Sequence, residues 1–150
     1  MRKMRAGIIG IGFIGQAHIE ALRRLGNVEV VALADQDGAK EKAEILFITK
    51  GYEDYKEMLD KENLDAVHIC TPNFLHFEMA KEAMERGIHV VLEKPFTVSL
   101  EEARALAKMA KDKNLVTCVN HTLRMFPQVK EMKALVEKGE VGDIFAVHGC

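Results

Sequence analysis

The sequence predicts an α/β fold with a doubly wound parallel sheet, and three observations carry this prediction. Short apolar runs alternate with longer stretches of helical periodicity along the chain. The run at 28–34 is apolar at nearly every position, which is typical of a strand that is buried on both faces. A glycine-rich turn joins the first run to the first helical stretch. Strands and helices that alternate in this way form parallel sheets with right-handed crossovers.

Local signals set the bounds of the expected elements. We expect strands at 6–9, 28–34, 66–70, 89–92, 115–119 and 144–148. We expect helices at 13–24, 39–47, 52–61, 74–86, 99–113 and 129–138. Ser99 and Glu102 form a capping box at the start of the fifth helix. Gly87 and Gly139 end the fourth and the last helix as C′ glycines.

The composition is that of an ordinary globular chain. Of its 150 residues 48% are hydrophobic and 29% charged, which suits one domain with a full core. The net charge of −2 argues against nucleic acid as the main partner, and no apolar run is long enough to cross a membrane. Cys70, Cys118 and Cys150 show neither metal-site nor disulfide spacing. We therefore expect a reducing, cytoplasmic setting.

The glycine-rich turn has the pattern of a phosphate-binding loop. Gly10 allows a tight turn, Gly12 lets the backbone approach a pyrophosphate, and Gly15 lets the helix pack closely on the strand. Phe13 and Ile14 open the helix, whose N-terminus offers free N–H groups and a partial positive charge to phosphates. The alternative is a tight turn that binds no ligand. The strand before the loop and the helix after it favour a dinucleotide site.

Asp35 closes the second strand, about 20 residues beyond the loop, where a ribose-binding acid is expected. Its carboxylate would accept hydrogen bonds from both ribose hydroxyls and would repel a 2′-phosphate. This favours NAD as the cofactor, while Lys40 and Lys42 nearby leave NADP open. The alternative is an ordinary turn acid, because the sequence at 35–38 also has the composition of a turn.

Three further polar clusters follow expected strands. They are Thr71, Pro72 and Asn73 with His76; Glu93, Lys94 and Pro95; and Asn120 and His121 with Arg124. Ligands of open α/β sheets bind outside the carboxyl ends of the strands. With the glycine loop and the ribose acid, five clusters fall at such ends, and we predict that they line one cleft.

Lys94 is the strongest candidate for chemistry. A lysine ammonium beside the nicotinamide could hydrogen-bond a substrate hydroxyl and stabilise the alkoxide that develops as hydride leaves. Glu93 could orient this lysine or balance its charge. The alternative is a charged surface turn, which spacing alone leaves equally open.

The histidines divide into two groups. His18, His68 and His89 lie in expected helices and strands, so we interpret them as packed or edge residues rather than ligands. His76 and His121 lie in strand-end loops and are better placed for function. The sequence indicates no metal site.

The motifs together resemble those of the Gfo/Idh/MocA oxidoreductases, and the resemblance covers nearly the whole chain. The matching stretches are the glycine loop at 7–15 with His18, the sequence CTPNFLH at 70–76, GIHVVLEKP at 87–95, Asn120 to Arg124 with Pro127, and GEVGDI at 139–144. The resemblance implies a Rossmann fold and hydride transfer between a nicotinamide cofactor and a sugar, polyol or related compound.

The resemblance also implies roles for individual residues. Lys94 matches the active-site lysine of the family, and Glu93 and Pro95 match its neighbours beside the nicotinamide. The loop at 71–76 matches one that runs along the cofactor, and Arg124 matches an arginine near the nicotinamide end.

Two departures from the family pattern stand out. The segment between Asp35 and Tyr52 is a few residues short, so we expect a trimmed second helix and third strand. Family members carry a second α/β domain with the substrate pocket, which we expect to be absent here. We therefore divide the chain into a dinucleotide-binding domain at 1–120 and, at 121–150, a connecting helix with the first strand of the missing domain.

These features leave two functions open. The chain is either part of a dehydrogenase that binds NAD(H) without turning over substrate alone, or a binding or regulatory module that acts with a partner chain. The expected strand at 144–148 has no sheet to join. We expect it to pair with a second copy of the chain, pack back on the domain, or fray.

Overall fold

The computed structural model describes residues 2–148 and confirms the doubly wound parallel sheet. The chain divides into two units, Met1–Asn120 and His121–Cys150, and each is described by itself. The strands of the first unit are β1 (Met4–Ile9), β2 (Val28–Ala34), β3 (Lys50–Tyr52), β4 (Ala66–Ile69), β5 (His89–Glu93) and β6 (Thr117–Asn120). Its helices are α1 (Phe13–Arg23), α2 (Ala39–Ile45), α3 (Tyr55–Lys61), α4 (His76–Glu85) and α5 (Leu100–Asp112), with a short 3-10 turn at Asn73–Leu75.

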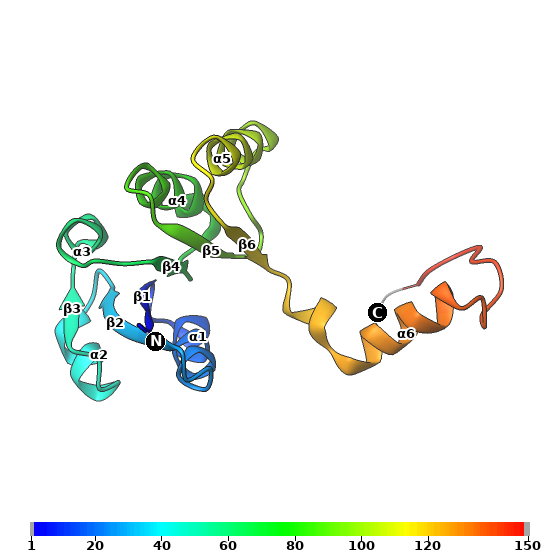
Figure 1. The fold of residues 1–150 in the computed structure, drawn as a ribbon, viewed down its shortest axis with the longest axis horizontal. Coiled ribbons are helices and arrows are strands. Elements are labelled where there is room, and N and C mark those ends of the chain that lie inside the picture. The colour runs from blue at the N-terminus through cyan, green and yellow to red at the C-terminus, as the bar shows by residue number, and fades with distance from the viewer. Residues whose placement is uncertain (1, 149–150) are drawn as a thin grey trace. The chain divides into compact units, whose positions relative to one another are not determined.

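The order of the strands creates one edge where many strand ends meet. The sheet has the order β3-β2-β1-β4-β5-β6, and every pairing is parallel (Figure 1). From β1 to β3, each new strand is added on the same side of the sheet. β4 then pairs with the other side of β1. The connections after β1 and β4 therefore leave in opposite directions. Such a reversal opens a crevice at the carboxyl ends of the two central strands.

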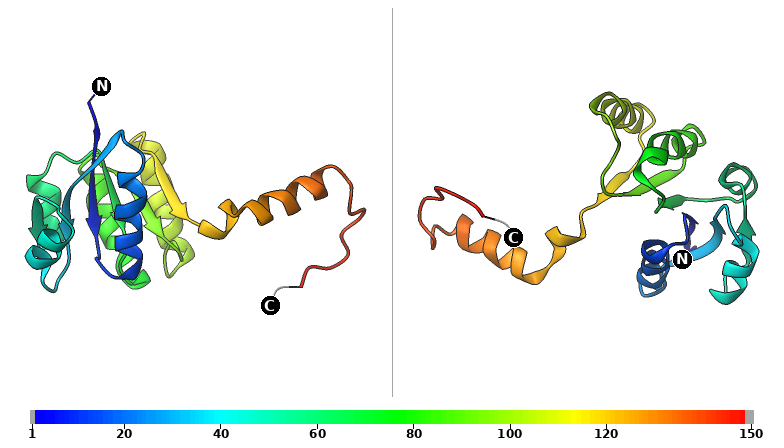
Figure 2. Two further views of the ribbon diagram at one scale, coloured as in Figure 1. Left: turned by 90° about the horizontal axis from the view of Figure 1, so that it is seen from below. Right: turned by 180° about the vertical axis from the view of Figure 1, so that it is seen from behind.

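Helices cover both faces of this sheet, and each face has its own core. On one face, Ile19 and Leu22 of α1 pack with Ile8 and Leu33 of the sheet in a cluster that α2 completes. On the other face, α3, α4 and α5 share a second cluster, in which Leu106 is fully buried. Figure 2 shows these layers from two further directions. Burying a side chain of this size contributes about 1.5–3 kcal/mol, so the two clusters hold the sheet rigid.

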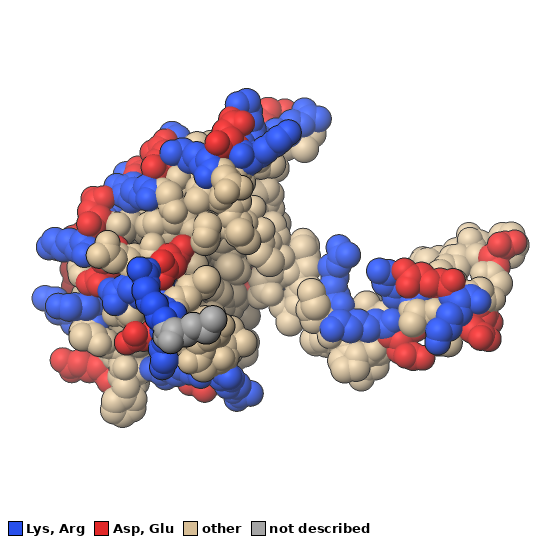
Figure 3. Space-filling model, viewed as in Figure 1, with Lys and Arg blue, Asp and Glu red and all other residues tan. Residues whose placement is uncertain are grey.

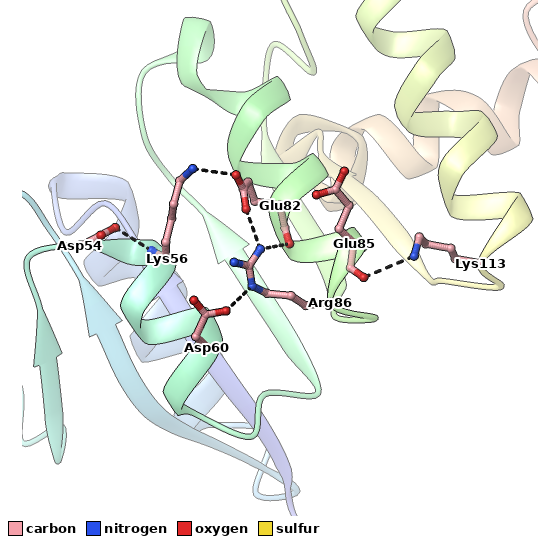
Figure 4. A network of polar contacts seen from close by, with 7 residues as sticks. All are labelled: Asp54, Lys56, Asp60, Glu82, Glu85, Arg86 and Lys113. Atoms are coloured by element: carbon pink, nitrogen blue, oxygen red, sulfur yellow. Dashed lines mark hydrogen bonds and ion pairs between the residues drawn. The ribbon is translucent and has the colours of Figure 1, made fainter.

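Polar contacts on the outside join α3 to α4. Arg86 donates to Asp60 on α3 at 2.7 Å and to the Glu82 carboxylate at 2.6 Å, and Lys56 of α3 lies 2.7 Å from the same carboxylate (Figure 4). Glu85 also accepts at its backbone oxygen from Lys113. The network therefore fastens α3 to α4, and α4 to the end of α5.

The outer surface of the first unit is mixed in charge. Figure 3 shows lysine and arginine side chains interspersed with aspartate and glutamate on the viewed face. This agrees with the net charge of −2. None of the helices within residues 2–148 is long and apolar enough to span a bilayer.

One of the expected element bounds was wrong in the middle of the chain. The helix expected from residue 52 begins at Tyr55, because Asp54 caps it by accepting the N–H of Lys56 at 2.8 Å. Tyr52 instead ends the three-residue strand β3, where it pairs with Ala34. With the seven-residue α2, this short strand gives the trimmed segment that the sequence predicts.

The second unit consists of a 3-10 turn at Thr122–Met125, helix α6 (Pro127–Glu137) and an irregular tail. The strand expected at 144–148 was wrong, because these residues have no regular structure and Phe145 is 95% exposed. A strand needs a neighbour for its backbone hydrogen bonds, and the described part of this unit contains no other strand. No residue of α6 is buried either.

The predicted capping box at α5 is confirmed in a modified form. Ser99 Oγ accepts the N–H of Glu102 at 3.2 Å, while the Glu102 carboxylate accepts the N–H of Val98 instead of Ser99. Replacing Ser99 by alanine (S99A) leaves one N–H of the first turn unpaired. We expect the free energy of unfolding in urea to fall by about 1 kcal/mol. S99D keeps an acceptor at this position and is expected to retain most of the stability, so an equal loss in both variants would contradict the capping role.

Candidate functional site

A cleft of about 530 Å³ lies at the carboxyl ends of β1, β2 and β4. Its walls include Gly10 and Gly12 after β1, Asp35 after β2, Tyr55 at the start of α3 and Thr71 after β4. The structure therefore brings together three of the predicted polar clusters. Tyr55 was missed by the sequence interpretation, because no motif marks a tyrosine at a helix start as part of a site.

The three positions of the loop are glycine for different physical reasons. Gly10 has a φ of +86°, and a Cβ there would lie within 3.0 Å of Thr71 and of the Cys70 backbone. A Cβ on Gly15 would lie 2.1 Å from the carbonyl oxygen of Gly10, so only glycine lets α1 approach the loop this closely. A Cβ on Gly12, in contrast, would meet no atom within 4 Å. Gly10 and Gly15 are thus required by the fold, whereas Gly12 borders open space.

The N-terminus of α1 has backbone donors that no side chain caps. Gly12 is the N-cap, and no side chain caps the helix. The first-turn N–H groups that begin at Phe13 and Ile14 therefore have no side-chain acceptor, and they carry the positive end of the helix dipole. Both side chains are exposed, at 87% and 39%. Open space beside Gly12 together with these donors fits a pyrophosphate.

Asp35 is held by three donors at the end of β2. Its Oδ2 accepts the N–H of Ile11 at 2.7 Å, and its Oδ1 accepts the N–H of Asp37 at 3.1 Å and lies 3.0 Å from Lys42 Nζ. Burial acts to raise the pKa of Asp35, but these donors outweigh it and hold the pKa below its usual value. The side chain thus makes the contact of a turn acid and also lines the cleft, and its role toward a ribose stays a prediction. Lys40 is exposed.

The loop after β4 is fastened by a buried histidine. Thr71 and Pro72 line the cleft, and the exposed Asn73 opens the 3-10 turn. The ring of His76 is fully buried, with Nδ1 lying 2.9 Å from the carbonyl oxygen of Pro95 and Nε2 lying 2.9 Å from that of Thr71. His76 therefore ties the loop after β4 to the loop after β5 from below the surface.

Glu93 is almost buried at the end of β5, and every contact that it makes is with a donor. Its Oε1 accepts from Asn120 Nδ2 at 2.6 Å and lies 3.0 Å from His18 Nε2, while its Oε2 accepts the backbone N–H of Lys94 at 3.2 Å. Burial acts to raise the pKa of Glu93, but the donors lower it below its usual value. The side chain of Lys94 is exposed and forms no ion pair with the described residues, and the peptide bond to Pro95 is cis.

His18 and His68 form a part of this site that the sequence interpretation missed. His18 Nδ1 lies 2.8 Å from His68 Nδ1, and its other ring nitrogen contacts the carboxylate after β5. The spacing of three residues from Gly15 was the available signal, because it places His18 on the same side of α1. His89 makes a structural contact instead, since its Nδ1 accepts the N–H of Val116 at the sheet edge.

The remaining polar candidates are placed as follows. His121 and Arg124 belong to the second unit, so their relation to the cleft stays a prediction. Burial, with the charge of Glu93, raises the pKa of the Cys70 thiol to about 12, which leaves it a neutral wall of the cleft. Within residues 2–148, no group of three or more histidine, cysteine, aspartate or glutamate side chains could hold a metal ion.

Residues 4–121 match the model of the oxidoreductase family with an NAD-binding Rossmann fold, Gfo/Idh/MocA. The chain is 33% identical to levoglucosan dehydrogenase of Pseudarthrobacter phenanthrenivorans, over 99% of its own length and 41% of the relative's. It is 30% identical to myo-inositol 2-dehydrogenase of Thermotoga maritima, over 93% of the chain and 42% of the relative. The chain thus spans about two fifths of the curated relatives that it matches.

Solved structures give the same result. Myo-inositol 2-dehydrogenase from Lactobacillus plantarum has a TM-score of 0.89 at 31% identity, with 95% of this chain and 43% of that one covered. The WlbA dehydrogenase from Bordetella pertussis, in complex with NADH and UDP-GlcNAcA, has a TM-score of 0.90 at 28% identity, with 96% and 45% covered. The chain belongs to the Gfo/Idh/MocA family of oxidoreductases, and residues 4–121 are its NAD-binding Rossmann domain.

Proposed function

We propose that this chain supplies the cofactor-binding wall of a dehydrogenase that acts on a sugar, a polyol or a related compound. The observation that carries the proposal is the open space beside Gly12, the N-cap of the uncapped helix α1, in the cleft that the ionised Asp35 also lines. NAD supplies the hydride acceptor at C4 of its nicotinamide ring. The substrate class rests on relatives named for levoglucosan and myo-inositol.

The adenosine half of the cofactor would lie along β1 and β2. The N–H groups at Phe13 and Ile14 would hold the pyrophosphate, and Gly12 would leave room for it. Asp35 would accept hydrogen bonds from the ribose hydroxyls, through the lone pairs of its carboxylate that Ile11 and Lys42 leave free. The ionised state of Asp35 supports this role, because an ionised carboxylate is the stronger acceptor.

The nicotinamide half would lie toward β4, β5 and β6. Thr71, Pro72 and Asn73 would border the cofactor, with His76 holding their loop in place. Pro95, Asn120 and Arg124 are further proposed neighbours of the ring.

Lys94 would carry the chemistry of the proposed reaction. Its exposed ammonium would donate to the substrate oxygen and stabilise negative charge as it develops there. Glu93 would set the position of this lysine through its backbone N–H.

A second candidate function is that of a binding module that works with a partner chain. One observation favours it: α6 buries none of its residues. The partner would be a second copy of this chain or a chain that supplies the substrate pocket. We place this activity in the cytoplasm, where Cys70 and Cys118 stay reduced. Light scattering at several concentrations separates a monomer from a self-associating chain.

The matched variants G12A and G15A test the cofactor site. G12A is expected to change the free energy of unfolding by less than about 0.5 kcal/mol, because the added methyl meets nothing. It should weaken NADH binding at least tenfold in a fluorescence titration, since the methyl fills the space meant for the pyrophosphate. G15A should instead lower stability by about 1–3 kcal/mol, because its Cβ collides with Gly10. Equal NADH affinity in G12A and the unchanged chain, or no binding at millimolar NADH, would refute the site.

Lys42 is expected to set how strongly the site discriminates between NADH and NADPH. Its ammonium lies on the Asp35 carboxylate and would offset the repulsion between that carboxylate and a 2′-phosphate. K42M should raise the ratio of the NADPH to the NADH dissociation constant by roughly tenfold, the size of one charge-assisted hydrogen bond. K40M removes an exposed lysine of the same helix and should leave the ratio unchanged. The same ratio in both variants would show that Lys42 has no such role.

A further inference from the structure

We infer that His18 is a positioning residue: it aligns the Glu93 carboxylate, and His68 aligns His18 in turn through a hydrogen bond between the two rings. The inference deepens the proposed function, because Glu93 in turn holds the backbone of Lys94.

Four elements of the first unit bring this chain of contacts together. In β4, Val67 and Ile69 point into the core under α4 and α5, so His68 between them faces the α1 side of the sheet. In β5, Val90 and Leu92 point into the same core, which leaves Glu93 on the α1 side as well. Helix α1 brings His18 onto this face, and β6 adds Asn120, which is the register partner of Glu93. The side chains of His18 and Glu93 are only 10% and 11% exposed.

The hydrogen bonds dictate where the protons lie. The Glu93 carboxylate only accepts, so His18 Nε2 must carry a hydrogen. In a neutral His18 ring, Nδ1 is then an acceptor, and the facing Nδ1 of His68 must be the donor at 2.8 Å. Asn120 Nδ2 also lies 3.1 Å from His18 Nε2, but its hydrogen goes to the nearer Glu93 oxygen at 2.6 Å.

His68 is suited to this task because it stays uncharged. Burial, with the nearby His18 ring, lowers the pKa of His68 to about 4, so the ring is neutral at ordinary pH. A charged His18 would donate from both nitrogens, and His68 would then accept with its other tautomer. In both states His18 keeps its Nε2–H on the carboxylate.

The donors around the Glu93 carboxylate determine its role. Each of its contacts is a donor from the protein: His18, Asn120 and the N–H of Lys94. The other titratable neighbour is the neutral Cys70 thiol. Glu93 is therefore held as a fixed carboxylate that orients the backbone at Lys94, and it leaves the Lys94 ammonium to the substrate.

Long-range ¹H–¹⁵N NMR of the full chain at neutral pH reads both rings directly and needs no cofactor. The expected pattern is His18 with a proton on Nε2 and a neutral His68 that does not titrate down to pH 5. A His18 ring without a proton on Nε2 would overturn the inference. This readout stands whether or not the proposed dehydrogenase function is correct.

The variants H18Q and H18L separate alignment from packing. Glutamine can donate to Glu93 and accept from His68, whereas leucine can do neither. In a ¹³C titration, H18L should raise the midpoint of Glu93 and H18Q should restore it toward that of the unchanged chain. H18L should also weaken NADH binding about tenfold, the effect of one lost hydrogen bond to a charged group, with recovery in H18Q.

The control is H89L, which removes a histidine at the start of β5 and should leave both readouts unchanged. Urea unfolding establishes that each variant is folded. If the unchanged chain binds NADH but H18Q and H18L give the same Glu93 midpoint, the alignment role is refuted while the proposed function stands. If the unchanged chain binds no NADH, the proposed function fails and the NMR pattern still decides the inference.

Discussion

The contact between Gly15 and the carbonyl oxygen of Gly10 sets how closely α1 approaches the sheet. A Cβ at Gly15 would lie 2.1 Å from that oxygen, so any other residue would push the helix away. Two consequences follow from this one approach. It fixes the position of the uncapped first turn of α1, and it brings His18, one turn further along, within 3.0 Å of Glu93. The position of the uncapped N–H groups of α1 and the support of the Glu93 loop therefore share one cause.

The sequence was sufficient to predict the sheet and most of the crevice. Alternating strands and helices imply a parallel sheet, and in a parallel sheet all strand ends lie at one edge. Asp35, Thr71 and Glu93 could thus be assigned to one edge from their places after apolar runs. The reversal of strand order between β1 and β4 then opens the cleft that Asp35 and Thr71 line. The structure adds a link between the glycine loop and Asp35 that the motif does not predict. Ile11 donates its N–H to the Asp35 carboxylate, which ties the loop to the end of β2.

The parts that the sequence could not predict depend on contacts between distant residues. His68 sits in an apolar strand and His18 in an amphipathic helix, so each alone has the pattern of a packed side chain. Only the fold reveals that their rings lie 2.8 Å apart. The prediction of a strand at 144–148 was wrong for a related reason. An apolar strand pattern describes one chain segment, whereas a strand also needs a neighbour, and the described second unit provides none.

The two ionised carboxylates of the first unit's strand ends differ in how much capacity they leave for ligands. Asp35 keeps part of its surface in the cleft, although Ile11, Asp37 and Lys42 already donate to it. Glu93 is turned inward, and its protein donors use both oxygens. A buried carboxylate left with fewer donors would cost free energy and tend to take up a proton. The protein donors around Glu93 therefore stabilise a negative charge next to Lys94 without an ion pair to the Lys94 ammonium. The exposed ammonium is left free to donate to an oxygen from outside the chain.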